Sequence, residues 1–225
     1  MSNRGTTGYT TLVSGVVAGA IAGAGLGRVI GGPDGTWIGA LAGAGAAGLP
    51  AYLVDGRAPS QPDRVFRWLV VLAAVACGLM AGFFFGFSAV VMRSLAVQPP
   101  AAGMAVMQTI NVAVFNPWFG VAFVVPPVAC VLALILALRH RPGTSGGYAI
   151  AGAVCYVVGT LLVTALCNVP RNDALAALAP AAATAPDLWA GYLREWTPWN
   201  HVRTVAALVA TVLLTLALVE DARSG

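Results

Sequence analysis

The hydrophobic residues of this chain are gathered into long runs separated by polar stretches. A transmembrane helix needs about 20 consecutive apolar residues, because each residue advances the helix by about 1.5 Å. Four runs meet this requirement without a charged residue in their interior, so each is predicted to cross a bilayer once. The predicted spans are residues 66–92, 119–138, 148–166 and 202–219.

The connections between the spans differ in character. Arg139, His140 and Arg141 open one short basic turn, whereas the stretches 93–118 and 167–201 are longer and rich in Asn and Trp. Because successive spans run in opposite directions, the two Asn-rich connections are expected on one membrane face and the basic turn on the other. The excess of arginine on the side of the basic turn favours a cytoplasmic location for it.

The amino-acid composition indicates that the protein lies in a lipid bilayer. The chain is 59% hydrophobic and 9% charged, with a mean hydropathy of +0.83, whereas a soluble domain is about 25% charged. We therefore expect an all-α integral membrane protein, multi-pass in the cell membrane with the lipid bilayer as its partner, in which residues 64–222 form an antiparallel four-helix transmembrane bundle. The net charge of +4 is too small and too scattered to suggest a nucleic-acid partner.

The first 56 residues are rich in glycine and alanine. Glycine recurs at every fourth position on both sides of a GGPDG turn, which puts glycines on one helix face where another backbone can approach closely. The pattern resembles a glycine-zipper helical hairpin over 1–56, joined by a linker at 57–63, and the same face would favour a homo-oligomer. A low-complexity extension is the alternative. The repeating glycines are Gly15, Gly19, Gly23, Gly27, Gly31, Gly35, Gly39 and Gly43.

Side-chain amides are concentrated in the two Asn-rich connections. Gln108 and Asn111 lie three residues apart on a predicted short helix, which ends at Asn116 because Pro117 disfavours the helical conformation there. In the other connection, the proline of NVPRN is predicted to end the third span between two more asparagines, Asn168 and Asn172.

The last span opens with the sequence EWTPWNHVRT. Thr197 is a suitable N-cap and Pro198 a suitable first helical residue, so the helix is predicted to begin there. This start would place Trp199, Asn200 and Arg203 on one helical arc. We expect the three to face inward, toward the asparagines of the other spans, with Arg203 stacked on Trp199.

Two accounts of these polar groups are open. Tryptophans favour the headgroup region and an arginine at a span end can reach the interface, so Trp118, Trp196 and Arg203 can each be anchors. The amides have no such preference, and an amide without a partner in lipid costs several kcal/mol. They are therefore expected to face one another or a wet pocket within the bundle.

Several of these motifs occur together in one known family. Residues 64–222 resemble the anthrone oxygenase-like family of small integral membrane proteins, a domain of unknown function. The matching stretches, in order, are AGFFFGFSAVVMRSL at 81–95, MQTIN and FNP within 107–117, NVPRN at 168–172 and WTPWNHVRT at 196–204. The resemblance implies a flat phenolic or anthrone-type ligand that is oxidised by O2.

The residues present can be compared with that chemistry. Haem or di-iron sites need several inward-facing His, Cys or Glu residues, whereas His140 and His201 are predicted on opposite faces, so neither a metal nor a cofactor is expected. An anthrone enolate can itself reduce oxygen, which leaves the protein to remove a proton and stabilise the anion. The predicted catalytic residues are His201, Arg203 and Asp173, and the predicted substrate-binding residues are Gln108, Asn111, Asn116, Asn168, Asn172, Trp196, Trp199 and Asn200.

A non-catalytic membrane scaffold, which associates through its glycine zipper, is the alternative function. It accounts for every residue without a substrate. A transporter fits less well, because the sequence has no inverted repeat and no charge in the middle of a span. The four cysteines, Cys77, Cys130, Cys155 and Cys167, lie in or beside apolar runs and are interpreted as small hydrophobic residues.

Overall fold

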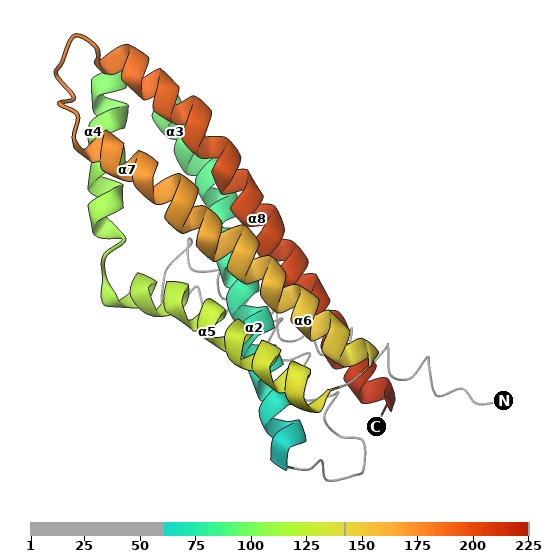
Figure 1. The fold of residues 1–225 in the computed structure, drawn as a ribbon. Helices are drawn as coiled ribbons and strands as arrows, with labels where there is room; N and C mark the ends of the chain where they lie inside the picture. Colours follow the sequence, from blue (N-terminus) through green and yellow to red (C-terminus); the bar gives the residue numbers. More distant parts are fainter. Residues whose placement is uncertain (1–60, 142, 225) are drawn as a thin grey trace, which may run out of the picture. The chain divides into compact units, whose positions relative to one another are not determined.

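The computed structural model describes residues 61–141 and 143–224, and this part of the chain is helical with no strand (Figure 1). The glycine-rich hairpin predicted for residues 1–56 lies outside the described residues. Four helical rods are long and apolar enough to cross a membrane, which confirms the prediction of an all-α, multi-pass membrane protein. The rods are Arg64–Ala96, Pro117–His140, Thr144–Ala176 and Ala185–Ser224.

Two of the rods contain π-helical turns, which widen an α-helix locally and often occur at functional sites. The first rod consists of α2 (Gln61–Gly86), the π turn η2 (Phe87–Val91) and α3 (Met92–Ala96). The third consists of α6 (Thr144–Tyr156), the π turns η3 (Val157–Leu162) and η4 (Thr164–Asn168), and α7 (Val169–Ala176). The remaining helices are α4 (Pro100–Ala113), α5 (Pro117–His140) and α8 (Ala185–Ser224).

The four rods run alternately in opposite directions (Figure 1). α2 packs against α5, and α5 packs against α6. The short helix α4 folds back from the end of α3 and contacts both α3 and α7. Because α4 runs back along the bundle, α5 begins part-way down it (Figure 1).

Glycines let the third rod approach α8 closely. A Cβ atom added at Gly152 would lie 2.9 Å from Leu214 Cγ. One added at Gly159 would lie 2.5 Å from Ala206 Cβ. Small residues commonly allow such backbone approach between transmembrane helices, where packing rather than the hydrophobic effect drives association.

Aromatic side chains form a second core around the first half of α8. Trp189 stacks on Tyr192 with ring centroids 5.6 Å apart, and Tyr192 stacks on Trp196 at 6.1 Å. Trp196 in turn contacts Phe87 of η2 at 5.5 Å. The cluster also includes Met104 and other apolar residues of α4 and α7, so it joins the first rod, α4 and α7 to α8.

The predicted start of the last helix was wrong. α8 begins at Ala185, so Thr197 is not an N-cap and Pro198 lies inside the helix. An internal proline removes one backbone hydrogen bond and costs about 3 kcal/mol. The stretch before Pro198 remains helical because it buries three large aromatic rings, those of Trp189, Tyr192 and Trp196, on one face.

The predicted end of the third span was also wrong. Pro170 lies in the first turn of α7, and the helical rod continues to Ala176. A proline is tolerated in the first turn of a helix, because its missing N–H has no helical acceptor there. The π turn that ends at Asn168 supplies this new start within the rod.

Exposed apolar side chains cover the outer faces of the rods. Leu79 on α2, Val124 on α5 and Leu208 on α8 are each about half exposed. A surface of this kind suits contact with lipid tails.

A buried carboxylate joins three segments at the far end of the bundle from α4. Asp221 on α8 accepts a hydrogen bond from Arg67 Nε on α2 at 2.5 Å and one from Arg141 Nη1, just after α5, at 2.5 Å. The Arg141 guanidinium also lies 4.8 Å from the ring centroid of Phe66. Asp221 itself is only 3% exposed. This Asp221 clamp therefore ties the end of the last helix to the beginning of the first rod and to the basic turn.

The cysteines lie within the helical rods and form no disulfide. Cys77 and Cys130 are buried, with their sulfur atoms 3.7 Å apart across α2 and α5. Cys155 and Cys167 are half-buried.

Candidate functional site

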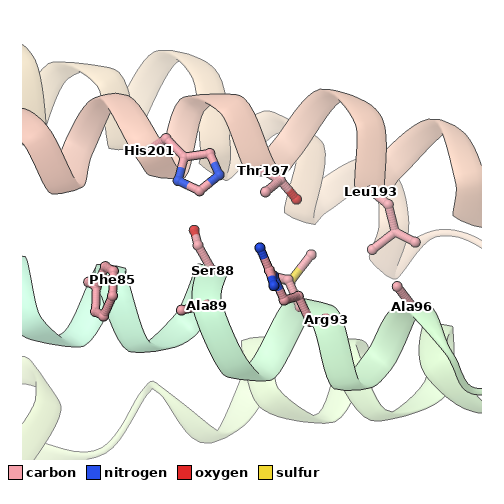
Figure 2. Close-up of a pocket in the computed structure, with 9 residues that line it drawn as sticks. Phe85, Ser88, Ala89, Arg93, Ala96, Leu193, Thr197 and His201 are labelled. Atoms are coloured by element: carbon pink, nitrogen blue, oxygen red, sulfur yellow. The ribbon is translucent and has the colours of Figure 1, made fainter.

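A groove of about 340 Å³ opens between the upper part of the first rod and α8 (Figure 2). Most of its wall is apolar and comes from α2, η2, α3 and α8. Its volume is at the lower end of the range for small-molecule pockets, about 300–1,000 Å³. The lining residues are Phe85, Ser88, Ala89, Met92, Arg93, Ala96, Leu193, Thr197 and His201.

Polar groups from both walls face this groove. Figure 2 shows the His201 ring on α8 and the Ser88 hydroxyl on η2 pointing toward each other, with Arg93 directed toward Thr197. His201 and Arg93 are both exposed. No acidic side chain in the described ranges lies within ion-pair distance of Arg93.

Behind the Ser88 wall lies a buried hydrogen-bond network centred on Asn200, whose exposure is 0%. Asn200 Nδ2 donates to Phe84 O at 2.8 Å and to Ser88 Oγ at 2.5 Å. Asn200 Oδ1 accepts from Arg203 Nη2 at 2.5 Å. We call this chain of groups the Arg203–Asn200–Ser88 relay; it connects a buried guanidinium to the surface of the groove.

Arg203 is held by aromatic rings and a hydroxyl. Its guanidinium carbon lies 4.4 Å from the ring centroid of Phe84 and 5.3 Å from that of Trp196. Its Nη1 donates to Thr164 Oγ1 at 3.2 Å, while Nε has no hydrogen-bond partner within the described part of the chain. No carboxylate among the described residues pairs with this cation, which is only 6% exposed.

The inward orientation predicted for Asn200 and Arg203 is observed, but their expected neighbours differ. Arg203 lies over Trp196 and Phe84, whereas the expected partner, Trp199, is half-buried. Helical side chains tilt toward the N-terminus, so a long arginine side chain reaches a residue two turns earlier.

The amides of the third rod form separate contacts with the first half of α8. Asn168 is buried and its Nδ2 donates to Trp196 O at 3.4 Å. Asn172 Oδ1 accepts from the Tyr192 hydroxyl at 2.9 Å. These amides join α7 to α8 and do not line the groove.

The two amides predicted on the short helix lie on α4. Gln108 Nε2 donates to Leu175 O at 2.8 Å and to Leu178 O at 2.9 Å, so it closes the end of α7. Asn111 Nδ2 is buried without an acceptor among the described residues.

Two predicted site residues lie apart from these contacts. Asn116 is exposed and caps α5, where its Oδ1 accepts from Phe119 N at 3.0 Å; the prediction that Pro117 excludes helix at Asn116 is confirmed by its extended backbone. Asn116 is separated from the other amides because α4 folds back along the bundle. Asp173 is exposed on α7 and does not line the groove.

The anthrone oxygenase family model matches residues 115–213. This part of the membrane domain is anthrone oxygenase-like. The match covers the α8 wall of the groove, including Thr197 and His201, and both residues of the relay on α8. The groove wall that carries Ser88 and Arg93 precedes the matched stretch. Neither the curated proteins nor the solved structures contain a significant match to the chain.

Sequence reasoning missed the first-rod wall of the groove. Ser88 is one of two serines in the motif AGFFFGFSAVVMRSL, the other being Ser94 near its end, and Arg93 follows Ser88 by five residues. A polar residue inside an apolar span is costly unless it has a partner, which is the signal that could have singled out Ser88. The described residues contain no group of three or more His, Cys, Asp or Glu side chains placed to hold a metal ion.

Proposed function

We propose that the groove binds a flat, enolisable phenolic aromatic of the anthrone type and promotes its oxidation by O2. The observation that carries this proposal is that His201 and Ser88 face each other from opposite walls of a largely apolar groove (Figure 2). The apolar lining suits aromatic rings, and the polar groups suit an oxygen substituent and an acidic C–H bond. The match of residues 115–213 to the anthrone oxygenase family model supports the same ligand class.

His201 is the proposed general base. Its imidazole lines the groove, whereas Asp173 does not, so His201 is the better placed of the two bases predicted from sequence. Removal of one proton from the methylene carbon of an anthrone gives an enolate, whose negative charge lies mainly on the oxygen of the former ketone. Arg93 adds a positive charge to the groove that favours this anion.

The oxidation itself needs only the enolate and O2. The enolate transfers electrons to O2, a carbon–oxygen bond forms at the former methylene carbon, and the second methylene hydrogen is lost as the O–O bond breaks. One oxygen atom remains as the new quinone carbonyl, and the other leaves as water with the two methylene hydrogens. The anthrone is oxidised, O2 is reduced, and no further reductant is required.

Oxygen uptake by the detergent-purified protein with dihydroxyanthrone tests this function. Because anthrones oxidise slowly without protein, the rate is compared with that of heat-denatured protein. His201→Ala is expected to lower the catalysed rate by about 100-fold or more. His140→Ala is the matched control, since His140 is exposed at the opposite end of the bundle and should leave the rate unchanged. Equal rates for native and denatured protein would contradict the proposal.

A further inference from the structure

We infer that Ser88 donates the hydrogen bond that stabilises the ligand anion, and that Asn200 and Arg203 act through it as positioning residues. This inference rests on the proposed function, because it assigns the group that receives the enolate or phenolate oxygen in the same groove. It changes the role expected for Arg203, which does not line the groove. Ser88 contacts the ligand, and Arg203 sets the direction of the hydrogen bonds behind it.

The Asn200 amide has a single orientation. Arg203 can only donate hydrogen bonds, so the atom of Asn200 that faces Nη2 must be the oxygen. Phe84 O can only accept, so the atom that faces it must be the nitrogen. Both requirements are met by the same orientation, and they leave the second Nδ2 hydrogen for Ser88 Oγ.

This orientation fixes the role of the Ser88 hydroxyl. Because Ser88 Oγ accepts from Asn200, its own hydrogen must point elsewhere. No acceptor in the described residues receives that hydrogen, while Ser88 lines the groove. The hydroxyl is thus a hydrogen-bond donor directed at the space that a ligand oxygen would occupy.

The positive charge of Arg203 strengthens this donor. Donation by a charged group polarises the Asn200 amide, and a chain of hydrogen bonds in a low-dielectric interior is mutually reinforcing. The guanidinium is buried and has no carboxylate partner in the described ranges, so its field is not cancelled nearby. An anion bound at Ser88 would lie one side chain away from this uncompensated charge.

Two π turns hold the relay in place. Ser88 belongs to η2, where the N–H of Met92 donates to Phe87 O five residues earlier. Thr164, which accepts from Arg203, belongs to η4. A π turn changes the angular position of the following side chains relative to a regular α-helix. Both rods that flank α8 therefore depart from regular helix where they contact the relay.

The test uses a ligand whose ionisation is visible. The probe 1,8-dihydroxyanthraquinone changes its visible absorbance when a phenol loses its proton, so the bound phenolate fraction can be titrated on the full-length protein in detergent. Ser88→Ala is expected to move the titration of the bound probe upward by about one pH unit, a tenfold change in the ionisation equilibrium. Ser88→Thr keeps a hydroxyl and should restore the original titration.

Asn200→Asp distinguishes an effect of hydrogen-bond direction in the relay from an effect of side-chain packing. The substitution keeps the size of the side chain, but a carboxylate only accepts, so the Ser88 hydroxyl would donate to the new carboxylate and no longer to the ligand. It also gives Arg203 a counter-ion. The bound probe is therefore expected to titrate at least as high as in Ser88→Ala. Thr204→Ala is the control, because the one acceptor of the Thr204 hydroxyl among the described residues is Asn200 O of its own helix, at 2.9 Å.

The outcomes distinguish this inference from the function on which it rests. If the unchanged protein does not bind the probe, the proposed function fails and the relay fails with it. If the probe binds and Ser88→Ala leaves its titration unchanged, the proposal that the groove binds this class of ligand is retained, and the proposed role of Ser88, Asn200 and Arg203 is overturned. A shift in Ser88→Ala and Asn200→Asp, with none in Thr204→Ala, supports the relay.

Discussion

Gly159 and Ala206 bring the third rod and α8 so close together that a Cβ atom at Gly159 would lie 2.5 Å from Ala206 Cβ. Gly159→Ala is therefore expected to force the two rods apart and to destabilise the protein by about 1–3 kcal/mol, the usual cost of overpacking. Thermal unfolding in detergent measures the change. The substitution tests whether the contact between these rods is needed for stability.

Gly82→Ala is the matched control for that experiment. Gly82 lies within α2, and a Cβ atom there meets no other atom of the described residues within 4 Å. Both substitutions change helix propensity in the same direction, so their difference reports the contact with Ala206. Equal unfolding temperatures for the two variants would show that the rods can separate without cost.

Asp221→Asn is expected to destabilise the bundle by about 3 kcal/mol, because it removes the buried charge that Arg67 and Arg141 both bind. Glu220→Gln provides the comparison one residue earlier. Glu220 pairs with Arg223, whose side chain is 57% exposed, and surface pairs contribute about 0–1 kcal/mol. Chemical unfolding of both variants should give a much larger loss for Asp221→Asn, and similar losses would contradict a special role for the clamp.

Arg93→Gln is expected to weaken binding of a carboxylated hydroxyanthraquinone by about tenfold, because it removes the cation that lines the groove. Arg194→Gln is the control. It removes the same charge from an exposed position on α8 and should leave the affinity unchanged. Quenching of tryptophan fluorescence can follow the titration. Loss of affinity in both variants alike would indicate a general effect of net charge.

Gln108→Leu is expected to loosen the end of α7, since Leu175 O and Leu178 O would both lose a donor. The cost of leaving such groups unsatisfied is about 1–3 kcal/mol. Hydrogen exchange should increase at residues 175–184. Thr109→Val should not have this effect, because within the described ranges the Thr109 hydroxyl binds just Ala105 O of its own helix. Unchanged exchange in Gln108→Leu would show that the Gln108 amide does not hold the end of α7.

The glycine zipper remains a prediction from sequence. If the repeat at 15–31 mediates association, replacing Gly19 and Gly23 together by leucine should lower either the stability or the oligomer size of the purified protein. Light scattering in detergent measures the second. No change in either property would favour a low-complexity extension.

The sequence was sufficient to predict the rods, because lipid requires long apolar runs and these are visible without any tertiary information. It was also sufficient to predict that Asn200 and Arg203 face inward, since a buried amide and a buried cation need protein partners. It could not predict which partners. Thr164, Phe84 and Ser88 lie 39, 116 and 112 residues away from the groups they contact, and no local pattern encodes those pairings.

The helix ends show a different limitation. Pro170 was predicted to end a helix and Pro198 to begin one, and both local signals were overridden. A π turn restarts the helix before Pro170, and burial of aromatic rings keeps the turns before Pro198 helical. Asn116 shows the opposite case, because the residues from Phe115 to Trp118 are exposed in the described part of the chain and Pro117 begins a new helix. Local propensity decides where burial is absent, and tertiary contacts decide where it is present.

The Asp221 clamp gives the order of biosynthesis a structural meaning. Asp221 follows Arg67 by 154 residues and Arg141 by 80, so the ribosome makes the carboxylate long after both of its arginines. The clamp can close only when the last helix has been inserted in full. A chain cut short before residue 221 would lack the carboxylate that joins Arg67 to Arg141, so the first rod and the basic turn would face each other as two like charges without their shared counter-ion.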